Sequence, residues 1–157
     1  MTTEELIVEA AKLPNPTNKA AAEYASRSEA FAAELNRIMC TREDLDALIG
    51  VNNQEMMKDN HRNHARFMSS LCARYHPETL VQTVLWVFRA YRAHGFHLTY
   101  WPAQLDSWIG LLQRELSKPA FDSIYPLYHF MLIHQPDFVR LSEQGAVGHQ
   151  ADHFVDG

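Results

Sequence analysis

The sequence predicts an all-α protein with a single domain, and three observations lead to this prediction. Apolar residues recur at intervals of three and four along most of the chain, which is the spacing that places them on one face of a helix. The seven prolines are expected to lie between these periodic segments, and no segment shows the alternation of a strand. A chain of 157 residues with 46% hydrophobic residues is long enough to bury one full core.

Local signals predict where the helices begin and end. Thr2 and Glu5 form a capping box, which opens a short helix to about Leu13. Pro77 fits the first turn of a later helix, and Gly95 fits the position just past its end. The other expected helices cover about residues 17–39, 41–49, 53–73, 101–117 and 119–135, with a short helical turn after residue 136.

These segments predict a bundle of about six to eight helices over residues 1–142. Residues 143–157 are polar, contain glycine and have no period, so we expect a flexible C-terminal tail there.

Two neighbouring helices place histidine on the face that we expect to be buried. On the first, His61 and His64 share a stripe with Met57, Met68 and Leu71. On the second, His94 falls on a stripe with Leu80, Val84, Val87 and Tyr91. An unpaired buried polar group costs about 1–3 kcal/mol, so each inward imidazole needs a partner. The pattern predicts an internal site that a metal, haem, a polar ligand or another side chain could complete.

Composition argues against several classes of function. A net charge of −5 does not suit nucleic acid, whose binding needs a basic face. The acidic N-terminus lacks the pattern of a signal peptide, and the longest apolar run, around residues 80–88, is too short to cross a bilayer. Cys40 and Cys72 make no disulfide framework and are expected to pack as small hydrophobes. We therefore expect a cytoplasmic protein that binds neither nucleic acid nor membrane.

Catalysis has little support in the sequence. No glycine-rich phosphate loop, nucleophile elbow or paired-cysteine motif is present. We expect a binding protein rather than an enzyme.

The segment after the second histidine-bearing helix resembles a family. Gly95 and Phe96 lead through a short loop to Trp101 and Pro102, which open a helix with inward apolar residues at Leu105, Trp108 and Leu112. This order is similar to that of bacterial and sensor globins, over roughly residues 45–135. The resemblance implies a globin-like fold and a haem that binds oxygen or another diatomic gas.

The resemblance also implies roles for individual residues. His94 would bind the iron, and His61 or His64 would face the gas. Three aromatic residues would lie beside the cofactor: Tyr91, Phe96 and Trp101. The separation of His64 and His94 along the chain is close to that between the distal and proximal histidines of globins.

Two departures from the family pattern lead to an alternative. Aligning Gly95 with the family glycine puts Tyr91, and not His94, at the iron-binding position. No aromatic residue around positions 41–44 matches the phenylalanine that stacks on haem in the family. Some sensor globins keep the fold without haem. The chain could likewise be a haem-free signalling or interaction module that acts through dimerisation and a protein partner.

The histidines themselves leave two further possibilities open. A zinc or non-haem iron site could form from His61, His64 and His94, with Asp59 or Asp44 as the nearest acids in sequence. The histidines of the first helix could instead bond to Tyr91, to Tyr100 or to each other inside a packed core.

Overall fold

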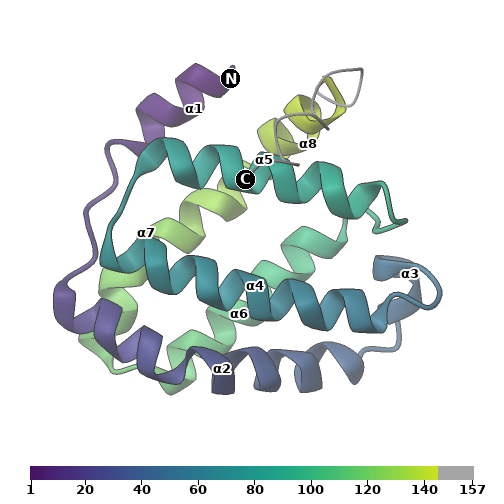
Figure 1. The fold of residues 1–157 in the computed structure, drawn as a ribbon, viewed down its shortest axis with the longest axis horizontal. Coiled ribbons are helices and arrows are strands. Elements are labelled where there is room, and N and C mark those ends of the chain that lie inside the picture. Colours follow the sequence, from purple (N-terminus) through teal and green to yellow (C-terminus); the bar gives the residue numbers. More distant parts are fainter. Residues whose placement is uncertain (145–157) are drawn as a thin grey trace.

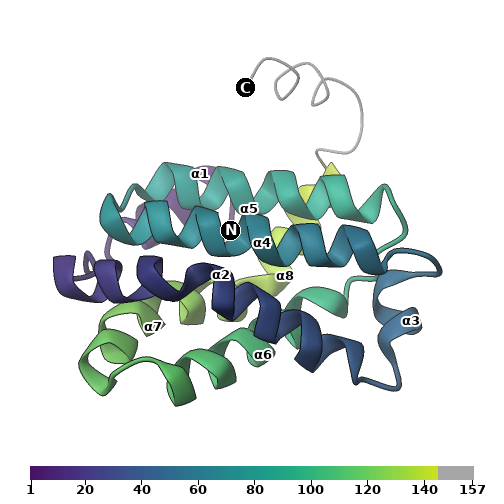
Figure 2. The same cartoon turned by 60° about the horizontal axis from the view of Figure 1, so that its bottom comes forward.

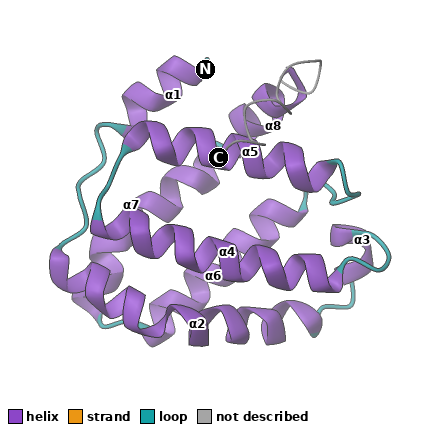
Figure 3. Cartoon of the chain, viewed as in Figure 1, coloured by secondary structure: helices purple, strands orange, loops and turns teal. Residues whose placement is uncertain are grey.

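The computed structural model describes residues 1–144, and within them the chain forms α-helices and no strand (Figure 1 and Figure 3). The helices of this described part are α1 (Thr3–Ala10), α2 (Asn18–Cys40), α3 (Leu45–Ile49), α4 (Gln54–Ala73), α5 (Pro77–Arg92), α6 (Tyr100–Glu115), α7 (Lys118–Ile133) and α8 (Gln135–Gln144). The predicted all-α fold is confirmed. Glu143 and Gln144 belong to α8, and the rest of the predicted tail lies outside the described residues.

The long helices form two layers around the core. α4 and α5 run through one layer, and α6 and α7 cross behind them in Figure 1. The turned view of Figure 2 shows α6 and α7 on the opposite side of the molecule from α4 and α5, with α2 along the edge between the layers. α2 packs along α4 and also contacts α6 and α7, whereas α1 and α8 both pack against α5.

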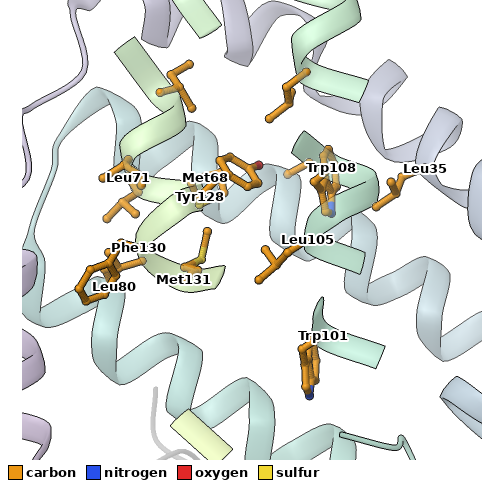
Figure 4. Packing of buried hydrophobic residues seen from close by; sticks show 14 of the residues in the cluster. Leu35, Met68, Leu71, Leu80, Trp101, Leu105, Trp108, Tyr128, Phe130 and Met131 are labelled. Carbon is orange, nitrogen blue, oxygen red and sulfur yellow. The ribbon is translucent and has the colours of Figure 1, made fainter. Parts of the chain in front are cut away.

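The space between the layers is filled by large side chains from α4, α6 and α7. Trp108 and Tyr128 lie at its centre, with Leu105 and Met131 nearby (Figure 4). The α4 stripe is inward as predicted, because Met57, His61 and Met68 are fully buried, Leu71 is nearly so and His64 is partly buried. The capping box of α1 is also confirmed, since the Glu5 amide donates to Thr2 Oγ1 and the Thr2 amide to Glu5 Oε1.

The turn after α5 places His94 differently from the prediction. Asn53 Nδ2 donates to the carbonyl oxygens of Ile49, at 2.7 Å, and of His94, at 2.8 Å. Gly50 (φ +82°) and Gly95 (φ +97°) let these two turns approach, and a Cβ on Gly50 would lie 3.1 Å from the Gly95 oxygen. The prediction that His94 points inward is wrong. The helix has already ended at Arg92, and the His94 side chain is exposed.

The buried face of α5 also differs from the predicted stripe. The residues of α5 that pack in the core are Leu80, Val81, Leu85 and Phe88. Val84, Val87 and Tyr91, which the stripe placed in the core, are only partly buried. α5 therefore turns part of its apolar surface toward the space between itself and α4.

Three smaller predictions are corrected. Pro126 lies inside α7 rather than between helices, where its ring removes one backbone hydrogen bond. Cys40, at the end of α2, is exposed, whereas Cys72 is buried as predicted. The turn predicted after residue 136 is a helix of 10 residues, α8, whose apolar face buries Phe138 and Leu141 against the core.

Residues 1–144 contain no candidate for a membrane-spanning helix. No helix there combines the length with the apolar character that crossing a bilayer requires.

Candidate ligand cavity

A cavity of about 210 Å³ lies where α4, α5 and α6 meet. Its walls are mainly aromatic and aliphatic, with Phe67 from α4, Val84 and Val87 from α5, and Trp101 and Leu105 from α6. Met131 and Gln135 extend the wall onto α7 and α8. No lysine, arginine, aspartate or glutamate is among the described residues that line it. An apolar space with a few polar groups is typical of sites for small ligands.

The cavity brings together only part of the predicted site. His64, Tyr91 and Trp101 line it. His61 and Phe96 do not, because His61 lies in the core and Phe96 packs its ring against Tyr91 and Tyr100.

The predicted iron ligand lies outside the cavity as well. His94 lines a separate, shallow hollow on the outer surface, next to Met56 and Asp59. Asn63, Trp86 and Tyr91 line both spaces, so the mouth of the cavity lies between α4 and α5.

One side of His64 is bound to a pair of buried tyrosines. Its Nε2 lies 2.9 Å from the Tyr128 hydroxyl, which lies 2.8 Å from the Tyr24 hydroxyl. The imidazole also packs on Trp108, with the ring centroids 4.7 Å apart. Burial, helped by the nearby His61, lowers the pKa of His64 to about 3. His64 is therefore neutral at pH 7.

His61 is held in a second polar network deeper in the core. Its Nδ1 lies 2.7 Å from Asn36 Oδ1, and its Nε2 lies 3.2 Å from the Tyr100 hydroxyl. That hydroxyl donates to Asn60 Oδ1, which also accepts from Gln104 Nε2. Burial lowers the pKa of His61 to about 3, so this imidazole is also neutral.

The sequence also allowed His61 and His64 to form hydrogen bonds with tyrosines inside the core, and this alternative is confirmed in part. His61 bonds to Tyr100, one of the predicted partners. His64 bonds to Tyr128 instead, and nothing local in the sequence pairs two residues that lie 64 positions apart. Tyr24, Gln104 and Met131 were also missed, because the spacing of histidines gives no signal for residues on other helices.

Two wall residues carry buried polar atoms without a partner. Trp101 Nε1 and Gln135 Oε1 have no hydrogen-bond partner within the described part of the chain. A buried polar group left unpaired costs about 1–3 kcal/mol, and an ordered water or a ligand can supply the partner. Two more such atoms in the described part of the chain, Arg89 Nε and Trp108 Nε1, belong to residues that do not line the cavity.

The residues at the cavity do not fit haem. His94 does not reach the cavity, and the Nε2 of His64 is already bound to Tyr128. Tyr91 is a poor alternative ligand, because burial raises the pKa of its phenol and disfavours the tyrosinate that would bind iron. The volume of about 210 Å³ is also below the 300–1,000 Å³ typical of sites for drug-sized ligands, and haem is a large ligand.

No further guidance comes from metal chemistry or from known proteins. Within residues 1–144, no three His, Cys, Asp or Glu side chains come together as a metal site requires, so the zinc or iron arrangement considered from the sequence is not formed.

Comparisons of the chain with protein-family models, with curated proteins and with solved structures gave no match. The globin-like relationship stays a prediction.

The tyrosine pair allows a first test of the geometry. We expect Tyr128→Phe to lower the free energy of unfolding by about 2–4 kcal/mol, because it leaves both the Tyr24 hydroxyl and His64 Nε2 buried without a partner. Tyr24→Phe should cost only about 1 kcal/mol, since Tyr128 would still bond to His64. Denaturant unfolding of the two variants measures the difference. Equal losses would show that Tyr128 does not bridge the other two residues.

Proposed function

We propose that this chain is a haem-free, globin-like module that binds a small, largely apolar molecule in the cavity between α4, α5 and α6. The observation that carries the proposal is the cavity itself, whose walls are mainly aromatic and aliphatic and include a few polar side chains. Largely apolar walls around a space of about 210 Å³ are typical of sites for small ligands, and the mouth between α4 and α5 gives a ligand access to it.

The position of the cavity also supports a sensor role. Gln135, in its wall, is the first residue of α8. α8 is held to α5 by Arg89, which donates to the Leu141 carbonyl, and by Arg92, which donates to Ser142 Oγ. A ligand that moves α5 against α7 would therefore also move α8. The dimerisation and the protein partner predicted from the sequence stay predictions.

Benzene is a suitable probe for the cavity. Apolar cavities of about 150 Å³ bind benzene, and this one is somewhat larger. We expect benzene to shift the amide signals of α4 and α5 in ¹H–¹⁵N NMR spectra of the full chain. Val87→Phe should fill the cavity and remove these shifts, whereas Val51→Phe, at a position that is 75% exposed, should leave them unchanged. Identical shifts in Val87→Phe, or none in the unmodified chain, would overturn the proposal.

Haemin serves as the second arm of this experiment. We expect the absorption spectrum of haemin to stay that of the free compound in the presence of the protein, because His94 lies outside the cavity. A sharp Soret band that is lost in Tyr91→Phe would contradict the haem-free assignment.

A further inference from the structure

The buried tyrosine pair determines which nitrogen of His64 carries the proton. Both hydroxyls are buried, and each has one proton to donate. Among residues 1–144, Tyr128 is the one hydrogen-bond partner of the Tyr24 hydroxyl, with the two oxygens 2.8 Å apart, so the Tyr24 proton points to the Tyr128 oxygen. Tyr128 then donates its own proton to His64 Nε2, at 2.9 Å. If Tyr128 instead donated its proton to the Tyr24 oxygen, the Tyr24 proton would be buried without an acceptor, which is unfavourable.

The tautomer of His64 follows from this direction of donation. A neutral imidazole has one nitrogen that donates and one that accepts. Because Nε2 accepts from Tyr128, the proton lies on Nδ1. The two nitrogens of the ring point in nearly opposite directions, and His64 lines the cavity while its Nε2 faces the core. Nδ1 makes no hydrogen bond with the described residues, so its N–H is available to a ligand.

The charge and volume of the cavity narrow the class of ligand. A carboxylate would lose its hydration there without finding a cationic side chain, because none lines the walls within the described residues. Scaling from a cavity of about 150 Å³ that binds benzene, the present volume of about 210 Å³ corresponds to a ligand of about eight non-hydrogen atoms.

We propose that His64 donates its Nδ1–H to an uncharged hydrogen-bond acceptor, such as a carbonyl oxygen, on a small apolar ligand. This assignment rests on the proposed function, because it names the ligand of the same cavity. Tyr128 acts as a positioning residue that keeps the proton of His64 on the side of the cavity.

Three probes of equal size test the ligand class. Acetophenone offers an uncharged acceptor, α-methylstyrene replaces its oxygen by a methylene group, and benzoate carries a negative charge. Titrations followed by NMR suit ligands this small, whose dissociation constants we expect on the order of 0.1–1 mM. Acetophenone should bind about fivefold more tightly than α-methylstyrene, as one net hydrogen bond allows, and benzoate should bind most weakly. Equal affinity for acetophenone and α-methylstyrene, or tightest binding of benzoate, would overturn the assignment.

Two variants identify the donor. His64→Phe keeps a ring against Trp108 but removes the N–H, so the preference for acetophenone should disappear while α-methylstyrene still binds. Tyr24→Phe is the matched control, because Tyr128 must still donate to His64, and the preference should persist. A preference that survives in His64→Phe would show that another group is the donor.

The tautomer can be read directly in the unmodified chain. In ¹⁵N-histidine-labelled protein at pH 7.5, the signal of His64 is identified by its absence from the His64→Phe spectrum. We expect the ¹⁵N chemical shifts of a neutral imidazole that is protonated on Nδ1. Chemical shifts of the tautomer protonated on Nε2 would overturn the assignment even if the fivefold preference were found. If none of the three probes binds, the proposed function itself fails. If all bind without the preference, only the ligand class fails.

Discussion

Replacing Met68 by Asp should lower the free energy of unfolding by about 4 kcal/mol or more, a large part of the 5–15 kcal/mol typical of a domain. Met68 is fully buried on α4, at the centre of the stripe that carries both inward histidines. Truncation of a buried methionine alone costs about 2–5 kcal/mol, and the aspartate adds a charge without a partner. Urea unfolding followed by circular dichroism measures the change.

Asn63→Asp provides the matched control for this substitution. It introduces the same side chain five residues earlier on the same helix, at a position that is exposed. We expect a change within about 0.5 kcal/mol, as for most surface positions. Met68→Leu, which keeps the volume, should cost less than about 1.5 kcal/mol and remain measurable if Met68→Asp does not fold. Similar losses in Met68→Asp and Asn63→Asp would mean that the stripe does not face the core.

The part of the fold that follows from local chemistry could be predicted from the sequence. The capping box of Thr2 and Glu5, the side-chain cap of Thr17 and the position of Pro77 in the first turn of α5 are all satisfied within a few residues of each helix start. The α4 stripe was also predictable, because its polar and apolar positions are separated clearly enough to fix one inward face.

The α5 face could not be predicted in the same way. Two adjacent apolar stripes fit the sequence of this helix at the same spacing, and the one with Val81, Leu85 and Phe88, not the predicted one, is the more buried. Val84, Val87 and Tyr91 fall on a regular stripe, yet they line a cavity rather than fill a core. Periodicity reports which side chains avoid water, and it does not tell contact with another side chain from contact with a ligand.

His94 shows a second limit of spacing arguments. Its position three residues after Tyr91 puts it on the same stripe only if the helix continues, and α5 ends at Arg92. The contact that holds the turn comes from Asn53, which lies 41 positions away in the sequence. Long-range contacts of this kind, like the bond from Tyr128 to His64, leave no periodic trace. The cavity was therefore predicted as an internal site, but its walls were only partly predicted.

Lowering the pH from 7.5 to 5.0 should reduce the free energy of unfolding by about 4 kcal/mol. Burial lowers the pKa values of His61 and His64 from 6.5 to about 3 in the folded chain. Between these two values the unfolded chain binds more protons, so stability is fully present above pH 6.5 and is lost as the pH falls toward 3. At pH 5.0 each histidine contributes about 2 kcal/mol to this loss.

Variants of the two histidines assign this loss to its source. His61→Gln and His64→Gln should each remove about half of the pH dependence, because glutamine stays uncharged over this range, even though both variants are less stable than the unmodified chain at pH 7.5. His129→Gln, on the exposed face of α7, is the control and should keep the full dependence. The measurement is the difference in unfolding free energy between the two pH values, from urea unfolding at each. An unchanged difference in both His61→Gln and His64→Gln would show that neither imidazole is buried in its neutral form, and the hydrogen-bond networks of the core would have to be assigned anew.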